Sequence, residues 1–461
     1  MIEPPQERQA TFGEVFAVPE FRVLFGSFTL LVAGDTVKML AFSVLVYGRT
    51  GSPGLSALAY MSGFLPYVIG GIFLLSLADR MRPRRLMVIG ELVRVVVCLT
   101  LGFAGLPVWT MLLLVVVTGA LSPVFGAARM ATLPELLPGD AFVLGRSVLT
   151  VTGAAAQIVG LAAGGAVLAL AGPGGALLIT AVLSGASAVV LRLGLPDRPP
   201  RATATRGGDP PRSRAARRAD PVRGADPGRE TDPVRGADPG RGTDSVRGTN
   251  PVGQTLRVNR RLLGDGRVRG LLLAAWAPMM FVAGAEAVVV PYLGERGTPS
   301  LAGLVLAAFA VGMAIGDFVV GRFAAPALRE RLSFPLAVAT GVPLLGFTAR
   351  PDIAWCLAFA VLTGICLAYN LGLQRRFVDA VPEDVRGQAF GLLSSGQMTC
   401  QGAGAALAGL LAELVPAHLA IALAGAGGTL AALALMRHLR PGGPACMEHL
   451  PSARVDAATD S

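Results

Sequence analysis

The sequence predicts an all-α membrane protein whose twelve transmembrane helices form two pseudo-symmetric six-helix bundles. Three observations predict this class. Of the 461 residues, 53% are apolar and 15% are charged, whereas charged residues make up about a quarter of a soluble domain. Apolar runs of about 20 residues, the length that crosses a bilayer as a helix, recur along the chain. One long polar segment, 194–268, divides these runs into two sets of six.

The predicted elements follow the apolar runs in order. In the first half the expected spans are 22–47, 55–78, 86–106, 109–130, 146–170 and 174–193. In the second half they are 269–293, 300–322, 332–349, 353–375, 388–413 and 417–437. The predicted domains are therefore an N-terminal segment at 1–20, a bundle at 21–193, a linker at 194–268, a second bundle at 269–439 and a tail at 440–461.

The linker is expected to be disordered, because its composition cannot bury enough apolar surface to offset the entropy of an ordered chain. A decaying hexapeptide repeat runs from Ala219 to Gln254. Residues 198–269 hold 17 arginines against 8 acids, which accounts for most of the net charge of +10, so nucleic-acid binding is not expected. The linker is either a plain tether or a segment that binds anionic lipid headgroups. The stretch 254–267 has the pattern of an amphipathic helix lying on the membrane.

Arginines in the short loops predict the orientation, because positive residues concentrate in cytoplasmic loops. The loops after spans 1, 7 and 9 hold only Arg49, Arg296 and Arg350. The loops and ends on the other side are rich in arginine: Arg80, Arg82, Arg84 and Arg85 after span 2, Arg129 and Arg146 around span 4, Arg322, Arg329 and Arg331 after span 8, Arg375, Arg376 and Arg386 after span 10, and Arg437 and Arg440 after span 12. Both termini and the linker are therefore predicted to be cytoplasmic, in a protein of the plasma membrane.

The two halves echo each other weakly, and several motifs resemble a known family. The motifs are LADRMRPRR after span 2, GAARMATLPELLP after span 4, QRRFVDAVPEDVRGQAFGLLSS after span 10 and AGDTVKMLAFSVLVYGRTGS in span 1. Together they resemble the major facilitator superfamily, over about residues 15–440 without the linker, and within it the branch of macrolide-efflux and enterobactin-exporter proteins. The resemblance implies a binding site between the two halves near the bilayer midplane.

The resemblance also implies that Asp79 is a latch between the halves on the cytoplasmic side. In the family this acid faces the N-terminal end of a helix in the other half, where a carboxylate is stabilised by about 0.3–1 kcal/mol. This sequence departs from the family pattern at Leu75, where the family has glycine, and at Pro83, which interrupts the basic run. The alternative is that Asp79 only neutralises the neighbouring arginines. The remaining gate residues of this motif are Arg80, Arg84 and Arg85.

Ionisable residues inside spans are candidates for function, since each costs about 2.5–3.5 kcal/mol at the centre of a membrane helix. Asp35 lies near the middle of span 1, and Lys38, the only lysine, lies on the same helix face. The pair either serves proton coupling at the central cavity or merely neutralises itself. Glu286 lies in span 7, the counterpart of span 1, with no cation within a helical turn. It is either a proton carrier or a structural acid.

The other polar residues of the spans are assigned to two groups. A structural network near the cytoplasmic end is expected to contain Glu91, Arg94, Arg129 and Asp79, with Asp317 pairing to Arg322 nearby. A second group either lines the cavity or holds helices together. Its members are Gln157, Asn370, Gln374, Gln397 and Gln401.

The sequence shows no sign of catalysis. It contains no phosphate-binding GxxxxGK[ST] motif, and its three histidines and five cysteines lack the spacing of metal ligands. No enzyme activity, metal or cofactor is expected. The expectation is a monomeric secondary transporter, surrounded by membrane lipids, that exports hydrophobic or weakly cationic small molecules in exchange for protons. The alternatives are an importer of the same fold and a transport-inactive sensor or scaffold.

Overall fold

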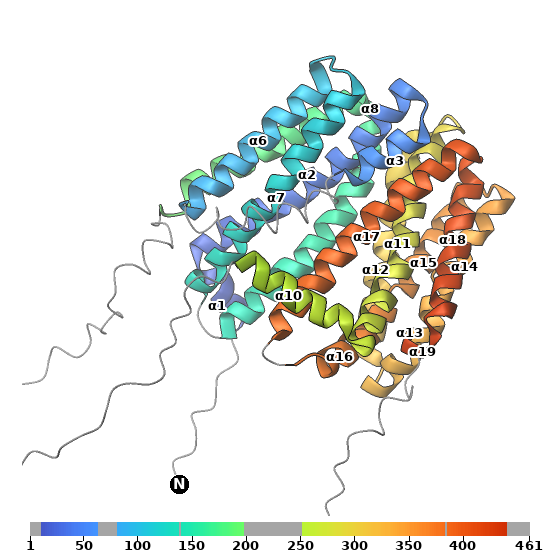
Figure 1. The fold of residues 1–461 in the computed structure, drawn as a ribbon. Helices are drawn as coiled ribbons and strands as arrows, with labels where there is room; N and C mark the ends of the chain where they lie inside the picture. The colour runs from blue at the N-terminus through green and yellow to red at the C-terminus, as the bar shows by residue number, and fades with distance from the viewer. Residues whose placement is uncertain (1–10, 63–80, 138–139, 198–250, 383–384, 440–461) are drawn as a thin grey trace, which may run out of the picture.

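The computed structural model describes residues 11–62, 81–137, 140–197, 251–382 and 385–439 (Figure 1). Asp79, Arg80 and residues 219–250 of the linker repeat lie outside the described residues. The helices of the first half are α1 (Phe12–Ala17), α2 (Pro19–Thr50), α3 (Pro53–Met61), α6 (Pro83–Phe103), α7 (Val108–Leu136) and α8 (Asp140–Gly194). Pro83, which interrupts the basic run in the sequence, is the first residue of α6. A proline is well suited to that position, because the amide of the first helical residue has no partner within the helix.

The element α8 contains two predicted spans, 146–170 and 174–193, as two helical segments joined at a break. The break between them lies at Gly172, whose φ of 66° and ψ of −179° are not helical, and Pro173 follows it. A backbone with positive φ favours glycine at this position. The two predicted spans are therefore separated at the expected place, and α8 turns back there toward the other end of the bundle (Figure 1).

The second half and the segment before it consist of long helices and several short helical turns. They are α10 (Pro251–Gly264), α11 (Gly266–Gly294), η2 (Pro299–Leu301), α12 (Ala302–Phe323), α13 (Pro326–Ala339), α14 (Val342–Leu345), η3 (Gly346–Ala349), α15 (Ile353–Cys366), α16 (Tyr369–Ala380), α17 (Arg386–Leu414), α18 (Ala417–Ala434) and α19 (Met436–Leu439). The predicted linker, 194–268, differs from the structure at its second end, where α10 is helical and α11 already begins. Asp265 caps α11 by accepting from the amides of Arg267 and Val268.

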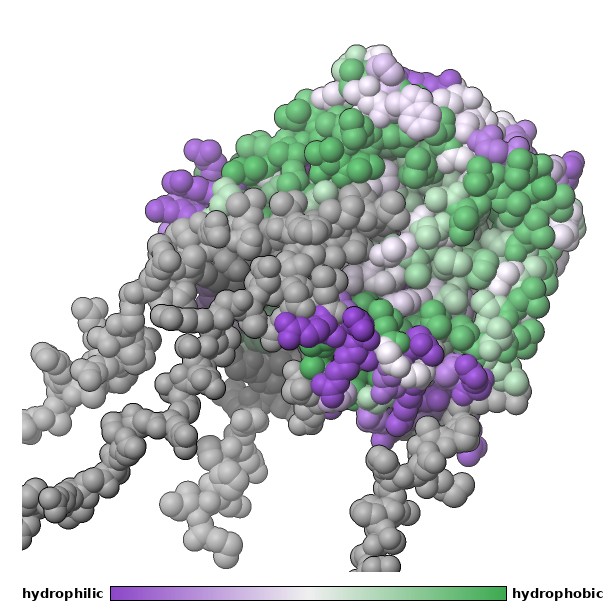
Figure 2. Space-filling model, viewed as in Figure 1, coloured by the Kyte–Doolittle hydropathy of each residue, from purple (hydrophilic) through white to green (hydrophobic). Residues whose placement is uncertain are grey.

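Within the described residues, nine helical segments are long and apolar enough to cross a membrane. This number counts α8 once, and it includes neither α3, which has nine residues in the described part of the chain, nor the more polar α17. Large apolar side chains are exposed around the bundle, as at Leu170 and Phe323. Figure 2 shows them as a hydrophobic surface with hydrophilic residues at the ends of the molecule. Such a surface requires lipid around it. The predicted all-α membrane fold is confirmed.

The two halves pack side by side, and three close contacts join them at one end (Figure 1). We call this the distal end, where α2 ends at Thr50 and α17 ends at Leu414; α1 and α19 lie at the opposite end. A Cβ added to Gly303 of α12 would lie 2.8 Å from the Cα of Gly165 in α8. Tyr47 of α2 packs against Gly294 of α11, and α3 packs against α17. The halves are therefore in backbone contact at the distal end.

Candidate functional site

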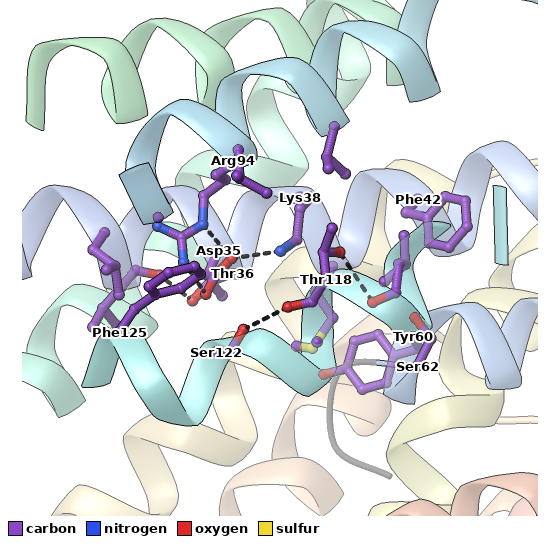
Figure 3. A pocket seen from close by; sticks show the side chains of 18 of the residues that line it. Asp35, Thr36, Lys38, Phe42, Tyr60, Ser62, Arg94, Thr118, Ser122 and Phe125 are labelled. Atoms are coloured by element: carbon purple, nitrogen blue, oxygen red, sulfur yellow. Dashed lines mark hydrogen bonds and ion pairs between the residues drawn. The ribbon is translucent and has the colours of Figure 1, made fainter. Parts of the chain in front are cut away.

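A cavity of about 360 Å³ lies inside the first half, beside the second half. Its walls come from α2, α3, α6, α7 and α8, and Met398 of α17 is the one lining residue from the second half. Most lining residues are apolar, as Figure 3 shows for Phe42 and Phe125. The polar lining residues are Asp35, Thr36, Lys38, Tyr60, Ser62, Arg94, Thr118, Ser122 and Gln157, and the three charged ones, Asp35, Lys38 and Arg94, lie together. The cavity therefore has a large apolar surface and a charged region.

Asp35 is the centre of the charged region, held between two cations (Figure 3). Its Oδ1 lies 2.6 Å from Nζ of Lys38, three residues later on α2. The same oxygen lies 3.1 Å from Nε of Arg94, and Oδ2 accepts from Nη2 of Arg94 at 3.4 Å. The predicted pair is thus present, but Arg94, which reaches it from α6, was expected in a different group. The exposed fraction is 40% for the side chain of Asp35 and 11% for that of Arg94.

Arg94 links Asp35 to a second, more deeply buried carboxylate. Its Nη1 donates to Glu91 Oε2 at 2.8 Å, and Arg129 Nη2 donates to Glu91 Oε1 at 3.4 Å. Arg129 also lies over the ring of Phe28, 5.6 Å from its centroid. The expected pairing of Glu91, Arg94 and Arg129 is therefore present. Together with Lys38 and Asp35 they form one chain of alternating charges across α2, α6 and α7, with three cations and two carboxylates.

We expect Glu91→Gln to destabilise the fold by about 3–5 kcal/mol, the usual effect of removing one partner of a buried ion pair. Glu91 is 2% exposed and holds two arginines. Arg129 Nε already has no hydrogen-bond partner among the described residues. Thermal melting of the purified protein measures the effect. Asp317→Asn, which removes an exposed acid with no ion pair in the described part of the chain, is the control and is expected to leave the melting temperature unchanged.

Glu286 lies on α11 and does not line the cavity. It is partly buried, and no cation pairs with it among the described residues. It is close enough to Tyr60, which does line the cavity, to interact with it electrostatically. Of the two acids singled out from the sequence, Asp35 lines the cavity and Glu286 does not.

The polar residues predicted for the cavity divide between different places. Gln157 lines the cavity. Asn370, Gln374 and Gln397 line a second cavity of about 160 Å³ inside the second half. Gln401 is buried in α17 and lines neither cavity. The five residues predicted as one polar group are thus divided: one lines the charged cavity, three line a separate cavity, and Gln401 lines neither.

The arginines after span 2 contact their own half. Arg84 donates to the carbonyl of Leu195 at 3.0 Å, and Arg82, Arg84 and Arg85 surround the carboxylate of Asp197 at 2.5, 3.7 and 3.9 Å. The hydrogen bond from Arg82 lowers the pKa of Asp197, and the charges of all three arginines act in the same direction. These arginines therefore fasten the end of α8. Sequence reasoning missed Asp197, although it is the first acid after span 6.

The expected pair between Asp317 and Arg322 is wrong. Asp317 is exposed on α12, and the guanidinium of Arg322 lies over the ring of Phe323, 5.9 Å from its centroid. A spacing of five residues places two side chains on different faces of a helix, whereas spacings of three and four bring them together. Asp317 and Arg322 form no ion pair in the part of the chain that the structure describes.

Comparisons with known proteins agree with the fold. A family model described as the Major Facilitator Superfamily matches residues 24–293 and 271–454. The multidrug efflux pump Tap of Mycobacterium tuberculosis and that of Mycobacterium bovis are each 30% identical to this chain over 184 residues. This match covers 38% of the chain and 43% of each relative, so it spans less than half the length of these curated relatives.

Solved structures of transporters share the fold at low sequence identity. The nucleoside transporter NupG superimposes with a TM-score of 0.62 at 11% identity, covering 92% of this chain and 99% of that one. A bacterial homologue of the iron transporter ferroportin, in an inward-facing state, superimposes with a TM-score of 0.60 at 14% identity, covering 94% and 100%. At these identities the likeness concerns the arrangement of the helices alone.

Proposed function

Since this chain belongs to the Major Facilitator Superfamily and is a transporter rather than an enzyme, we propose that it exports amphipathic small molecules in exchange for protons. The observation that carries this proposal is the cavity of about 360 Å³ with Asp35, Lys38 and Arg94 in its wall. Charges inside a membrane protein are costly and mark pathways of substrates or ions. The similarity to multidrug efflux pumps over part of the chain supports export.

In this proposal the two acids have different roles. Protonating Asp35 would weaken its ion pairs with both Lys38 and Arg94. Protonating Glu286 would break no ion pair among the described residues. Glu286 is therefore the better proton carrier, and Asp35 holds the two cations in the wall of the cavity. This assignment narrows the expectation from sequence, which gave both acids the same role.

The charges of the cavity also bear on the substrate. Among the described residues, its ionisable lining residues are the cations Lys38 and Arg94 and the carboxylate of Asp35, an excess of one positive charge. A substrate that accepts hydrogen bonds from Lys38 or Arg94 at its polar end, and lays an apolar body against Phe42 and Phe125, fits this cavity. A weakly cationic substrate, which the sequence led us to expect, fits this cavity less well. That expectation did not include the positive charge of Arg94 at the cavity.

In this proposal, the contacts at the distal end support one conformation. With both termini in the cytoplasm, as the arginine distribution predicts, the distal end faces outward and is closed. The protein is then open toward the cytoplasm, the side from which an exporter takes up its substrate. Rocking of the two halves about the cavity would expose it to the other side.

The direction of transport is tested in cells that express the chain. Neutral, cationic and anionic amphipathic dyes are loaded, and their efflux is followed before and after an ionophore collapses the proton gradient. We expect efflux that depends on the proton gradient. It should be fastest for a dye whose polar end accepts hydrogen bonds. Gradient-driven accumulation would identify an importer instead. Normal insertion without flux of any of the three dyes would favour the sensor or scaffold alternative.

A further inference from the structure

A glutamate of the second half caps a helix of the first half at the distal end. Glu413 lies one residue before the end of α17, and α3 begins at Pro53. Oε1 of Glu413 accepts a hydrogen bond from the backbone amide of Gly54 at 2.9 Å. The hydroxyl of Ser52 donates to the same oxygen. One carboxylate oxygen therefore joins segments that are about 360 residues apart in the chain.

Glu413 provides an acceptor that α3 lacks within its own sequence. The first amides of a helix have no partner inside the helix. In α3, Pro53 has no amide hydrogen, and the amide of Leu55 donates to Oγ of Ser52 at 3.0 Å. The amide of Gly54 is left, and Glu413 accepts from it. The negative charge is also favourable at this position, because a helix N-terminus carries partial positive charge.

This contact requires the two halves to touch. One turn before Glu413, Gly409 packs on the same segment: a Cβ added there would lie 2.7 Å from Cβ of Ala57 and 3.2 Å from Cα of Gly54. A side chain of any size at Gly409 would hold α17 and α3 apart. Separation of the halves at the distal end must therefore break the contact between Glu413 and the first turn of α3.

We propose that Glu413 is a positioning residue whose contact with Ser52 and Gly54 latches the distal end closed, and that each transport cycle breaks and remakes it. This inference rests on the proposed function for its role in transport. Glu413 is not among the described residues that line the cavity, so it acts on the balance between the closed and open distal ends. Loss of the latch is expected to change that ratio about tenfold, which corresponds to about 1.4 kcal/mol.

The test measures the distal end directly, with spin labels on Ala104→Cys and Thr298→Cys in a cysteine-free background of the full chain. Both positions are exposed at the distal end, one in each half. Glu413→Gln is expected to raise the population with the longer distance about tenfold, and Glu413→Asp to restore part of the short distance. Asp352→Asn is the matched control, because Asp352 Oδ1 accepts from the amide of Trp355 at 3.1 Å and so caps α15 at the same end but within one half.

Unchanged distances in Glu413→Gln, with an unchanged melting temperature, would overturn the latch. If Glu413→Gln does not fold, Ser52→Ala tests the same contact from the other half, and unchanged distances in that variant would overturn it equally. The readout needs no transport activity. If the distance changes but the protein moves no dye, the latch is supported and the proposed function is rejected. If the protein exports dye but the distances stay unchanged, the latch is rejected and the proposed function is supported.

Discussion

An Asp35→Asn variant is expected to insert into the membrane and fold normally. It should transport at least about tenfold more slowly, which corresponds to a free-energy difference of about 1.4 kcal/mol. The carboxylate holds Lys38 at 2.6 Å and Arg94 at 3.1 Å. Its loss leaves Lys38 without an ion-pair partner among the described residues, and an uncompensated charge in the membrane interior costs about 2.5–3.5 kcal/mol. The two cations then no longer keep their places in the cavity wall. Initial rates of dye efflux, divided by the amount of protein in the membrane, measure the loss.

Two further variants separate the functional role of Asp35 from simple neutralisation of Lys38. Glu20→Gln removes an acid from the first turn of the same helix and is expected to transport normally. The double variant Asp35→Asn with Lys38→Met removes both charges of the pair. If the pair only neutralises itself, the double variant would transport as the parent protein does. We expect it to remain as slow as Asp35→Asn.

A Glu286→Gln variant is expected to lose proton-driven transport while keeping exchange of substrate across the membrane. Glutamine has the shape of a neutral glutamic acid but cannot release or take up a proton. Because no ion pair of the described residues involves Glu286, the substitution leaves the charged chain from Lys38 to Arg129 intact. Vesicles loaded with unlabelled substrate should therefore still exchange it for labelled substrate, while a pH gradient should no longer drive net movement.

The control for Glu286 is Glu295→Gln, at the end of the same helix and far from the cavity lining. It should keep both exchange and gradient-driven transport. Net transport that still follows the pH gradient in Glu286→Gln would assign the proton to another group. Asp35 would then be the next candidate, since it is the one carboxylate among the described residues that line the cavity.

Features that depend on neighbours along one helix could be predicted from the sequence. Asp35 and Lys38 are three residues apart, and so are Glu91 and Arg94; both pairs form as expected because this spacing brings side chains together. The apolar runs predicted the helices, and the break inside α8 falls at Gly172, between two predicted spans. The five-residue spacing of Asp317 and Arg322 fails for the same geometric reason.

Contacts between different helices could not be predicted in this way. The pairing of Arg94 with Asp35 depends on how α6 crosses α2, and the pairing of Arg82 with Asp197 depends on where α8 ends. Glu413 gave no signal in the sequence, since its partners Ser52 and Gly54 lie in the other half. In each case the residue types were visible, but their distances are set by tertiary packing.

The most direct test of the account uses the purified protein in liposomes with a pH indicator inside. Protein is inserted so that the distal end faces the interior, the interior is made acidic, and dye is added outside. We expect dye to enter against its concentration gradient while the interior becomes less acidic, and we expect Glu286→Gln to abolish both changes together. Dye movement that proceeds at the same rate without the pH gradient, and without any loss of internal protons, would contradict it.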